Sequence, residues 1–419
     1  MTHEFDTTAD LTDHSQVHIA PLPRISVQAF CETAEISALL NAAVQDRRMI
    51  KTHVKINMGG APAAVEAYSS SPTPNLIIIE TTGEREALIE NLDLLAPHCD
   101  AGTKVVVIGR VNDIMLYRML MSRGVSEYMV TPFGIVELIG HLSALYSAPG
   151  IENVGRVIAV TGAKGGVGAS TVAHNLGWSI SEKLMMPTVI VDLDLAFGTT
   201  GLDFNQDPPQ GIAEAVFSAD RLDANFVDRL MSRCSDRLSI MAAPATMERT
   251  YDFTESSFDQ VIDILRAAVP YVILDVPHGW SNWIRRALVG ADQLIVVSEP
   301  DLANLRNTKN IFDAMRNARP HDRRPHLVLN RVGLQKRPEI SVPDFSKAVE
   351  SDPIVEIAFD AKLFGTASNN GHMLSEIEAE HKSSAALDYL ARVVTGRAEI
   401  KKEKKSLLGP LMSRLRKSA

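Results

Sequence analysis

The most constraining feature of this chain is a glycine-rich stretch that joins an apolar run to a helical pattern. Residues 162–171 read Gly-Ala-Lys-Gly-Gly-Val-Gly-Ala-Ser-Thr, and they follow the apolar run from Val157 to Val160. Glycines allow successive backbone N–H groups to surround an anion, and the N-terminus of the following helix adds positive potential. The stretch therefore predicts a phosphate-binding loop between a strand and a helix.

This loop lacks the lysine of the usual phosphate-binding pattern. The pattern Gly-x4-Gly-Lys-Ser/Thr carries a lysine directly after its last glycine, and here that position is Ala169. A second lysine, Lys164, stands earlier in the loop, and the hydroxyl of Ser170 is placed to bind Mg²⁺. We assign nucleotide binding to the loop residues Gly165, Gly166, Val167, Gly168, Ala169, Ser170 and Thr171.

Short apolar runs alternate with helical patterns on both sides of the loop, which is typical of βα units and parallel sheets. The runs begin at residues 25, 54, 76, 105 and 128 before the loop, and at 157, 188, 238, 271, 294, 327 and 355 from the loop onward. Several are continuous Val/Ile/Leu runs, as expected for strands covered by helices on both faces. The fold class is therefore α/β, with two doubly wound parallel-sheet domains.

The length of 419 residues also predicts two domains, because it exceeds what one compact core usually holds. The segment Ser147-Ala148-Pro149-Gly150 breaks the alternation and marks the boundary. We expect a disordered leader at 1–23, a receiver-like domain at 24–147, an ATP-binding domain at 155–397 and a basic amphipathic tail at 398–419.

Cysteine usage and hydropathy predict a cytoplasmic protein. The three cysteines, Cys31, Cys99 and Cys234, are scattered and form no Cys-x-x-Cys pair, which disfavours a disulfide framework or a cluster site. No apolar run approaches the roughly 20 residues that span a bilayer. The first 23 residues mix acidic side chains with threonines and do not resemble a signal peptide.

Polar residues follow several of the predicted strands at their carboxyl ends. Asp192 and Asp194 follow the run at 188, and their period-two spacing places both carboxylates on one face, toward the phosphates. Asp275 ends the run at 271, where an aspartate orders a water on the metal in comparable sites. Asn330 and Arg331 could meet a base edge, or they could be a strand end followed by a surface arginine. Ligands of doubly wound sheets bind beyond these strand ends, so the pattern predicts one site beside the loop.

The first domain resembles a response-regulator receiver domain. The segment 124–133, Gly-Val-Ser-Glu-Tyr-Met-Val-Thr-Pro-Phe, is similar to that family's last strand and Lys-Pro-Phe turn. A working receiver needs a phosphoryl-accepting aspartate, an acidic pair for Mg²⁺ and a lysine before the proline, whereas this sequence offers Glu80, Cys31-Glu32 and Thr131. We therefore expect a docking or dimerisation module that phosphate does not switch, with Glu80 and Glu32 as solvated loop residues.

The second domain resembles the MinD/ParA ATPases with a deviant Walker A loop. The similarity lies in Lys164-Gly165-Gly166-Val167-Gly168 with its Ser-Thr pair, and in the acidic motif from Asp192 to Asp194. The resemblance implies that Lys164 reaches the partner's nucleotide across a dimer. It further implies that Asp194 positions the attacking water, that Ser170, Asp192 and Asp275 support Mg²⁺, and that Asn330 touches adenine.

The front module and Ala169 together are similar to the TadZ/CpaE family, which places the tight-adherence (Flp) pilus machinery at the cell pole. The resemblance implies an ATP-binding scaffold that forms a homodimer, ATP-dependent or constitutive, and contacts pilus assembly and secretion proteins. Because Ala169 removes a charge from the phosphate site, we expect ATP to bind with Mg²⁺ and to be hydrolysed slowly.

Two alternatives to this function remain. One is a ParA-like ATPase that partitions DNA or cargo, but the acidic body, which carries about −15 outside the tail, disfavours DNA. The other is a metabolic enzyme with a similar loop. Such an enzyme would require the loop lysine, which this sequence lacks at Ala169.

The tail from Lys401 combines basic residues with Leu407, Leu408, Leu411 and Leu415. Such a segment can lie at the inner membrane or pole as a peripheral contact, or it can be a solvated charged tail.

Overall fold

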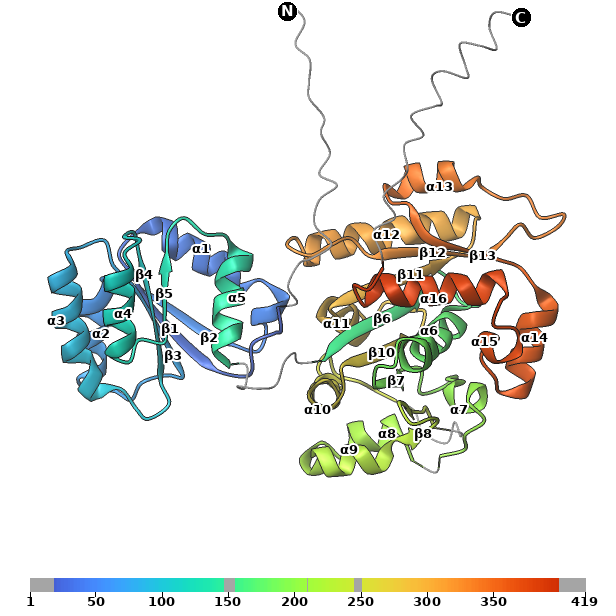
Figure 1. The fold of residues 1–419 in the computed structure, drawn as a ribbon, viewed down its shortest axis with the longest axis horizontal. Coiled ribbons are helices and arrows are strands. Elements are labelled where there is room, and N and C mark those ends of the chain that lie inside the picture. Colours follow the sequence, from blue (N-terminus) through green and yellow to red (C-terminus); the bar gives the residue numbers. More distant parts are fainter. Residues whose placement is uncertain (1–18, 147–154, 209, 245–250, 399–419) are drawn as a thin grey trace, which may run out of the picture.

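The computed structural model describes residues 19–146, 155–208, 210–244 and 251–398. They form two α/β domains that lie side by side (Figure 1). Within these ranges no helix is both long and apolar enough to cross a membrane. Most of the expected leader and nearly all of the expected tail lie outside the described residues.

The first domain is a five-stranded parallel sheet with the order β2-β1-β3-β4-β5. Helices α1 and α5 cover one face, and α2, α3 and α4 cover the other (Figure 1). Because both faces are covered, the central strand β3 is buried along its whole length. The elements are β1 (Ser26–Cys31), α1 (Ala34–Val44), the 3₁₀ turn η1 (Arg47–Met49), β2 (His53–Met58), α2 (Gly60–Tyr68), β3 (Leu76–Glu80), α3 (Arg85–Leu95), η2 (Ala96–His98), β4 (Lys104–Gly109), α4 (Ile114–Ser122), β5 (Glu127–Val130) and α5 (Ile135–Tyr146).

The second domain is an eight-stranded sheet with the order β13-β12-β11-β6-β10-β7-β9-β8. Its central strands are β6 (Arg156–Gly162), β7 (Thr188–Asp192), β10 (Tyr271–Val276), β11 (Gln293–Ser298) and β12 (His326–Val332). The remaining strands are β8 (Ser232–Arg233), β9 (Leu238–Met241) and β13 (Pro353–Ala358).

Helices cover both faces of this second sheet. One hydrophobic core lies beneath α8 (Ile212–Phe217), α9 (Ala224–Leu230), α10 (Asp259–Ala268), α11 (Asn282–Gly290), α12 (Leu302–Ala318) and α13 (Val342–Val349). The other lies beneath α6 (Ala169–Trp178), the π-helical turn η3 (Ser179–Lys183), α14 (Ala361–Asn370), α15 (Leu374–Ile377) and α16 (Lys382–Val394). The short helices α7 (Thr200–Asp203) and η4 (Ala219–Arg221) lie in the connections that follow β7.

The predicted α/β class with two parallel sheets is confirmed, and every predicted apolar run is a strand that begins within two residues of the expected start. Two details differ. The two-residue strand β8 pairs antiparallel with β9 at the edge of the second sheet, and it is too short to give a sequence pattern. Residues 19–23 belong to the first domain and not to a leader, because Leu22 is buried in the core beside α1 and α5 and its N–H donates to Arg48 O.

Glu80 is buried at the end of β3, which corrects the expectation of a solvated loop residue. Its Oε2 accepts the backbone N–H groups of Glu32 (2.8 Å) and Thr33 (2.9 Å), and its Oε1 accepts the Thr33 hydroxyl at 2.6 Å. Glu32 is exposed, but its carboxylate accepts both the N–H and the hydroxyl of Thr82 at 2.6 Å. The carboxylate that would stand in for a phosphoryl acceptor therefore holds the loop before α1.

We expect Glu80→Ala to lower the free energy of unfolding by about 2–3 kcal/mol, because it strips the part-buried N–H groups of Glu32 and Thr33, just before α1, of their acceptor. Urea unfolding of the full chain measures this difference. Glu90→Ala, which removes an exposed carboxylate from α3, is the matched control and should change little. Equal stability of the Glu80 variant and wild type would show that these bonds contribute nothing.

The two domains meet through buried ion pairs that η1 makes with the second domain. Arg47 Nε donates to Asp322 Oδ2 at 2.6 Å, and its Nη1 donates to Asp292 Oδ1 at 3.2 Å. Arg48 pairs with Asp46 at 2.9 Å and with Asp322. These side chains are at most 9% exposed. Asp292 and Asp322 precede β11 and β12, so the contact lies at the amino ends of the strands, opposite to the edge that carries the glycine-rich loop.

Asp322 is the carboxylate shared by both arginines. Burial alone would raise the pKa of Asp322, but the charges of Arg47 and Arg319 and the hydrogen bond from Arg47 outweigh burial and lower this pKa to about 2. A lowered pKa stabilises the folded chain above the unfolded pKa near 4, and this contribution disappears as the pH falls toward 2.

Asp322→Asn should therefore lower the free energy of unfolding at pH 7 by about 2–3 kcal/mol. The difference from wild type should shrink between about pH 4 and pH 2, as Asp322 itself becomes protonated. Thermal and urea unfolding at several pH values measure it. Asp313→Asn, which changes a half-exposed aspartate on α12, is the control. A pH-independent difference would contradict the ion-pair explanation.

Candidate nucleotide-binding site

The glycine-rich loop connects β6 to α6, as predicted, and two of its glycines require their residue type. Gly166 and Gly168 have φ values of 81° and 85°, in the left-handed region that favours glycine. A Cβ on Gly168 would also lie 2.6 Å from Asn330 Nδ2. Asn330 approaches this closely because its Nδ2 donates to Val167 O at 2.8 Å. The end of β12 is thereby fixed against the loop.

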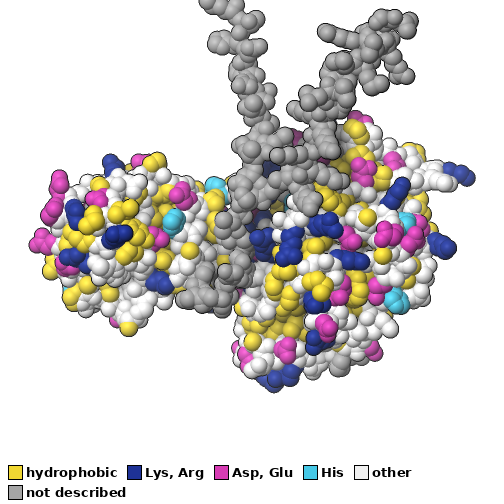
Figure 2. Space-filling view, in the orientation of Figure 1, with side chains coloured by type: hydrophobic (Ala, Val, Ile, Leu, Met, Phe, Trp, Pro, Cys, Tyr) yellow, Lys and Arg dark blue, Asp and Glu magenta, His cyan; other side chains and the backbone are white. Residues whose placement is uncertain are grey.

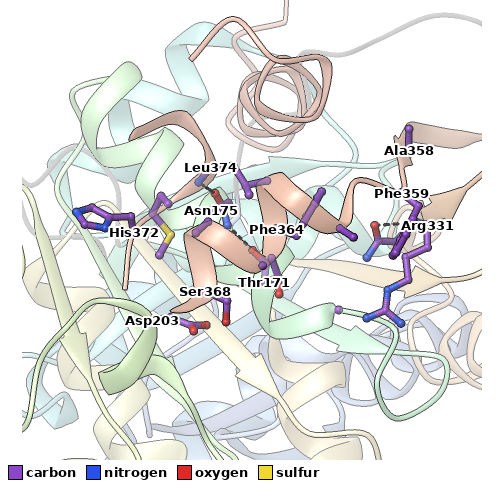
Figure 3. A pocket seen from close by; sticks show the side chains of 16 residues that line it. Thr171, Asn175, Asp203, Arg331, Ala358, Phe359, Phe364, Ser368, His372 and Leu374 are labelled. Atoms are coloured by element: carbon purple, nitrogen blue, oxygen red, sulfur yellow. Dashed lines mark hydrogen bonds between the residues drawn. The ribbon is translucent and has the colours of Figure 1, made fainter. Parts of the chain in front are cut away.

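A cavity of about 330 Å³ lies beside the loop, between α6 and α14 (Figure 3). Arg331, Ala358 and Phe359 lie at one end in this view, and Asp203, Ser368 and His372 lie at the other. Thr171 and Asn175 of α6 form the wall between the two ends. The complete lining is Gly168, Thr171, Asn175, Asp203, Asn330, Arg331, Ala358, Phe359, Ala361, Phe364, Gly365, Ala367, Ser368, His372, Met373 and Leu374.

The guanidinium of Arg331 is held at the mouth of this cavity. The backbone of Arg331 has φ of 52°, which is uncommon for a residue other than glycine. Its Nη1 donates to Glu299 Oε1 at 2.9 Å, and Arg337 pairs with the other oxygen of the same carboxylate. The Arg331 side chain keeps 43% of its surface exposed. It therefore remains able to contact a ligand while Glu299 fixes its position.

Side chains from the end of β10 and from α12 contact the first residues of the loop. His278, which follows β10, lies with Nδ1 3.0 Å from Gly162 O, and Asn307 of α12 donates to Ala163 O at 2.9 Å. Lys164 is exposed. Its positive charge contributes to a lowered pKa of Asp301, the N-cap of α12, together with hydrogen bonds from Asn304, although burial alone would raise that pKa.

The two carboxylates of the Asp-x-Asp motif lie in different surroundings, contrary to the expectation that both face the phosphates. Asp192 is fully buried, and its oxygens accept the N–H (3.1 Å) and hydroxyl (2.8 Å) of Thr200 and the N–H of Asp194 (3.1 Å). Burial and the neighbouring charge of Asp275 raise the pKa of Asp192 to about 6. Asp194 is half-buried and accepts Phe197 N–H at 3.1 Å. The reason is that the connection after β7 folds back over Asp192.

A buried histidine that sequence reasoning missed lies between the carboxylates of Asp203 and Asp275. His174 of α6 is completely buried, with Nδ1 2.7 Å from Asp203 Oδ2 and Nε2 3.3 Å from Asp275 Oδ2. Burial alone would lower the pKa of His174, but the hydrogen bonds and charges of Asp203 and Asp275 raise it to about 10. The only sequence signal was a histidine on the apolar face of the helix that follows the loop.

The predicted residues therefore form two adjoining groups. Gly168, Thr171, Asn330 and Arg331 line the cavity. Asp192 and Asp275 lie side by side, because β7 and β10 pair in register at these residues. They do not line the cavity.

The residues present fit a site for Mg²⁺ that is completed by phosphate and water. No group of three or more His, Cys, Asp and Glu side chains in the described ranges could hold a metal ion by itself. Mg²⁺ needs no such cage, because it keeps several waters and uses one or two protein ligands besides phosphate oxygens. The Ser170 hydroxyl at the start of α6 and the carboxylate of Asp275 at the end of β10 supply ligands of this kind.

Comparison with known proteins agrees with this geometry. Residues 155–327 match the model of the AAA domain family AAA_31. The septum site-determining protein MinD of Bacillus subtilis is 26% identical over 260 residues, which cover 58% of this chain and 90% of that protein. The second domain is therefore similar to the P-loop ATPases of the MinD/ParA family.

Solved structures resemble each of the two domains. The MinD protein of Pyrococcus horikoshii, solved with Mg-ADP, covers 57% of this chain and 95% of its own, with 20% identity and a TM-score of 0.51. The pilus assembly protein CpaE of Caulobacter crescentus is 46% identical over 31% of this chain and 100% of its own, with a TM-score of 0.30.

Proposed function

We propose that this protein is an ATP-binding scaffold that dimerises and positions pilus assembly proteins, and that it hydrolyses ATP slowly. The observation that carries the ATP-binding part is the loop from β6 to α6 beside a 330 Å³ cavity, with Asn330 fixed against the loop and Arg331 at the mouth. The loop accounts for phosphate recognition, and the adjoining cavity has room for the nucleoside.

Each predicted residue has a role in this proposal. The backbone of residues 165–171 binds the phosphates, and the Ser170 hydroxyl and Asp275 hold Mg²⁺. Asp192 supports the metal site indirectly, through the position of the neighbouring Asp275. Its own oxygens are engaged with Thr200 and Asp194. Asp194 orients the attacking water. Mg²⁺, when bound, supplies positive charge beside the transferring phosphoryl group, and Lys164 of a second copy substitutes for the charge of the missing loop lysine.

Exposed apolar side chains support dimerisation through the edge of the sheet that carries the loop. Phe197 and Leu202 follow β7, Trp280 follows β10, and Leu302 begins α12 after β11. Each of the four is at least 54% exposed. Lys164 is exposed at the same edge. A second copy placed over this edge would bury the four apolar side chains and bring its Lys164 to the facing nucleotide.

Lys164→Ala should abolish ATP-dependent dimerisation, because the variant loses the charge that reaches the partner's phosphates. Equilibrium sedimentation with and without ATP measures the association constant. Lys183→Ala, which removes an exposed lysine from η3, is the control and should dimerise as wild type does. If the Lys164 variant and wild type respond to ATP alike, Lys164 does not act across a dimer.

Ala169 begins α6, so a lysine at this position would stand directly after Gly168, where the usual loop carries it. Ala169→Lys should raise the rate of ATP hydrolysis roughly tenfold or more, because it restores a charge on the transferring phosphoryl group. Phosphate release measures the rate, and Ala169→Met, of similar length without the charge, is the control. An unchanged rate in the lysine variant would mean that Ala169 does not limit turnover.

The pilus part of the proposal is supported by the first domain, whose sequence is 46% identical to the whole Caulobacter crescentus CpaE chain. Because Glu80 is engaged in holding α1, this domain acts as a docking module and not as a phosphate switch. Acidic side chains also gather at its outer edge, where α3 carries Glu86, Glu90 and Asp93 (Figure 2). This charge does not favour the DNA-partitioning alternative, which a gel shift at several salt concentrations would test.

A further inference from the structure

His174 occupies a position where an ordinary core side chain would be apolar. It lies on α6 among Val172, Ala173 and Leu176, all buried against the sheet, and none of its own surface is exposed. The ring of Phe204 lies against it at 5.7 Å between centroids. A polar ring in such surroundings persists only where its nitrogens find partners.

Both ring nitrogens of His174 face oxygen atoms. Nδ1 lies 2.7 Å from Asp203 Oδ2. Nε2 lies 2.9 Å from Thr200 Oγ1 and 3.3 Å from Asp275 Oδ2. Asp203 and Thr200 are the two ends of α7, and Asp275 lies near the end of β10. One imidazole therefore joins the helix after the phosphate loop to α7 and to the strand-end carboxylate.

The direction of these hydrogen bonds follows from the hydrogens available. The Thr200 hydroxyl has a single hydrogen, and it lies 2.8 Å from Asp192 Oδ2, which can only accept while ionised. Thr200 Oγ1 therefore donates to Asp192 and accepts from His174 Nε2, while His174 Nδ1 donates to Asp203. His174 is thus a donor on both sides, and the chain of bonds runs from Asp203 through His174 and Thr200 to Asp192.

His174 does not line the cavity, so it acts on a ligand only through its partners. Asp203 is part of the cavity wall, and Asp275 belongs to the proposed metal side of the site. A shift of either carboxylate changes the length of a bond to the same ring. The nucleoside cavity and the metal side are in this way connected by one buried side chain.

We propose that His174 is a positioning residue that couples the cavity wall to the strand-end carboxylates, so that nucleotide and Mg²⁺ bind cooperatively. This inference rests on the proposed ATP-binding function. It adds to that function a residue outside the phosphate loop that touches neither ligand.

Two conservative variants separate the two sides of the ring. In His174→Gln the amide nitrogen can reach the position of Nε2, so the bonds to Thr200 and Asp275 are kept and that to Asp203 is lost. In His174→Asn the amide nitrogen takes the place of Nδ1, so only the bond to Asp203 is kept. His326→Gln is the matched control: His326 is a half-buried histidine at the amino end of β12, with Nε2 3.2 Å from Gln293 Oε1.

The measurement is the dissociation constant of a fluorescent ATP analogue for the full chain, with Mg²⁺ and with EDTA. Its readout is the dissociation constant in EDTA divided by the dissociation constant with Mg²⁺. This ratio reports the coupling between nucleotide and Mg²⁺ and not activity. We expect both His174 variants to lower this ratio at least about fivefold, while His326→Gln keeps the wild-type ratio. Circular dichroism checks folding. Where a His174 variant does not fold, the nearly isosteric Thr200→Val should lower the ratio in the same direction, because it removes the hydroxyl that joins His174 to Asp192 and leaves the contacts of His174 with Asp203 and Asp275 in place.

The results separate the inference from the function on which it rests. If the His174 variants weaken binding by the same factor with and without Mg²⁺, the ring only supports the fold and the proposal is overturned. An unchanged ratio in a folded Thr200→Val chain overturns it as well. If wild type binds no ATP analogue in either condition, the proposed function itself fails.

Discussion

The second domain depends on burying carboxylates at the ends of apolar strands. Asp192 and Asp275 lie side by side at the ends of β7 and β10, almost without exposed surface. Two adjacent negative charges in such surroundings repel one another and lose solvation, and the raised pKa of Asp192 reflects both effects. Two side chains act as partners of these carboxylates. His174, on the helix after the phosphate loop, lies against Asp275, and Thr200, in the connection after β7, donates to Asp192. The arrangement of loop, helix and strand ends follows from satisfying these groups.

The two edges of the second sheet carry different features. The carboxyl edge carries the phosphate loop, the cavity and the exposed apolar side chains. The amino edge carries Asp292 and Asp322, which pair with Arg47 of the first domain. Helix α11 connects the edges, because it begins at Asn282 after β10 and ends at Gly290, whose carbonyl accepts a bond from Arg47. The first domain is therefore attached at the edge opposite to the one that carries the glycine-rich loop.

Much of this architecture was predictable from local patterns. Each strand of more than two residues appeared as an apolar run, because strands covered on both faces must be apolar along their length. The phosphate loop and Asp275 were predictable because their spacing relative to a strand end carries the chemistry. Glu80 and His174 were not, because the partners that make a buried charge tolerable come from distant segments: Glu80 meets Thr33, and His174 meets Asp203. A charged residue in a sequence gives no sign of whether such a partner exists.

The sequence by itself determined the two α/β domains, the place of the phosphate loop and the missing lysine at Ala169. These features depend on periodicity and on residue type at fixed spacing, which the chain carries locally. The tertiary structure alone decided that Asp192 turns toward Thr200, that a histidine of the loop's own helix lies between two carboxylates, and that η1 attaches the first domain to the amino edge of the second sheet. Each of these is a long-range pairing of buried polar groups, and its free energy depends on geometry that only the folded chain provides.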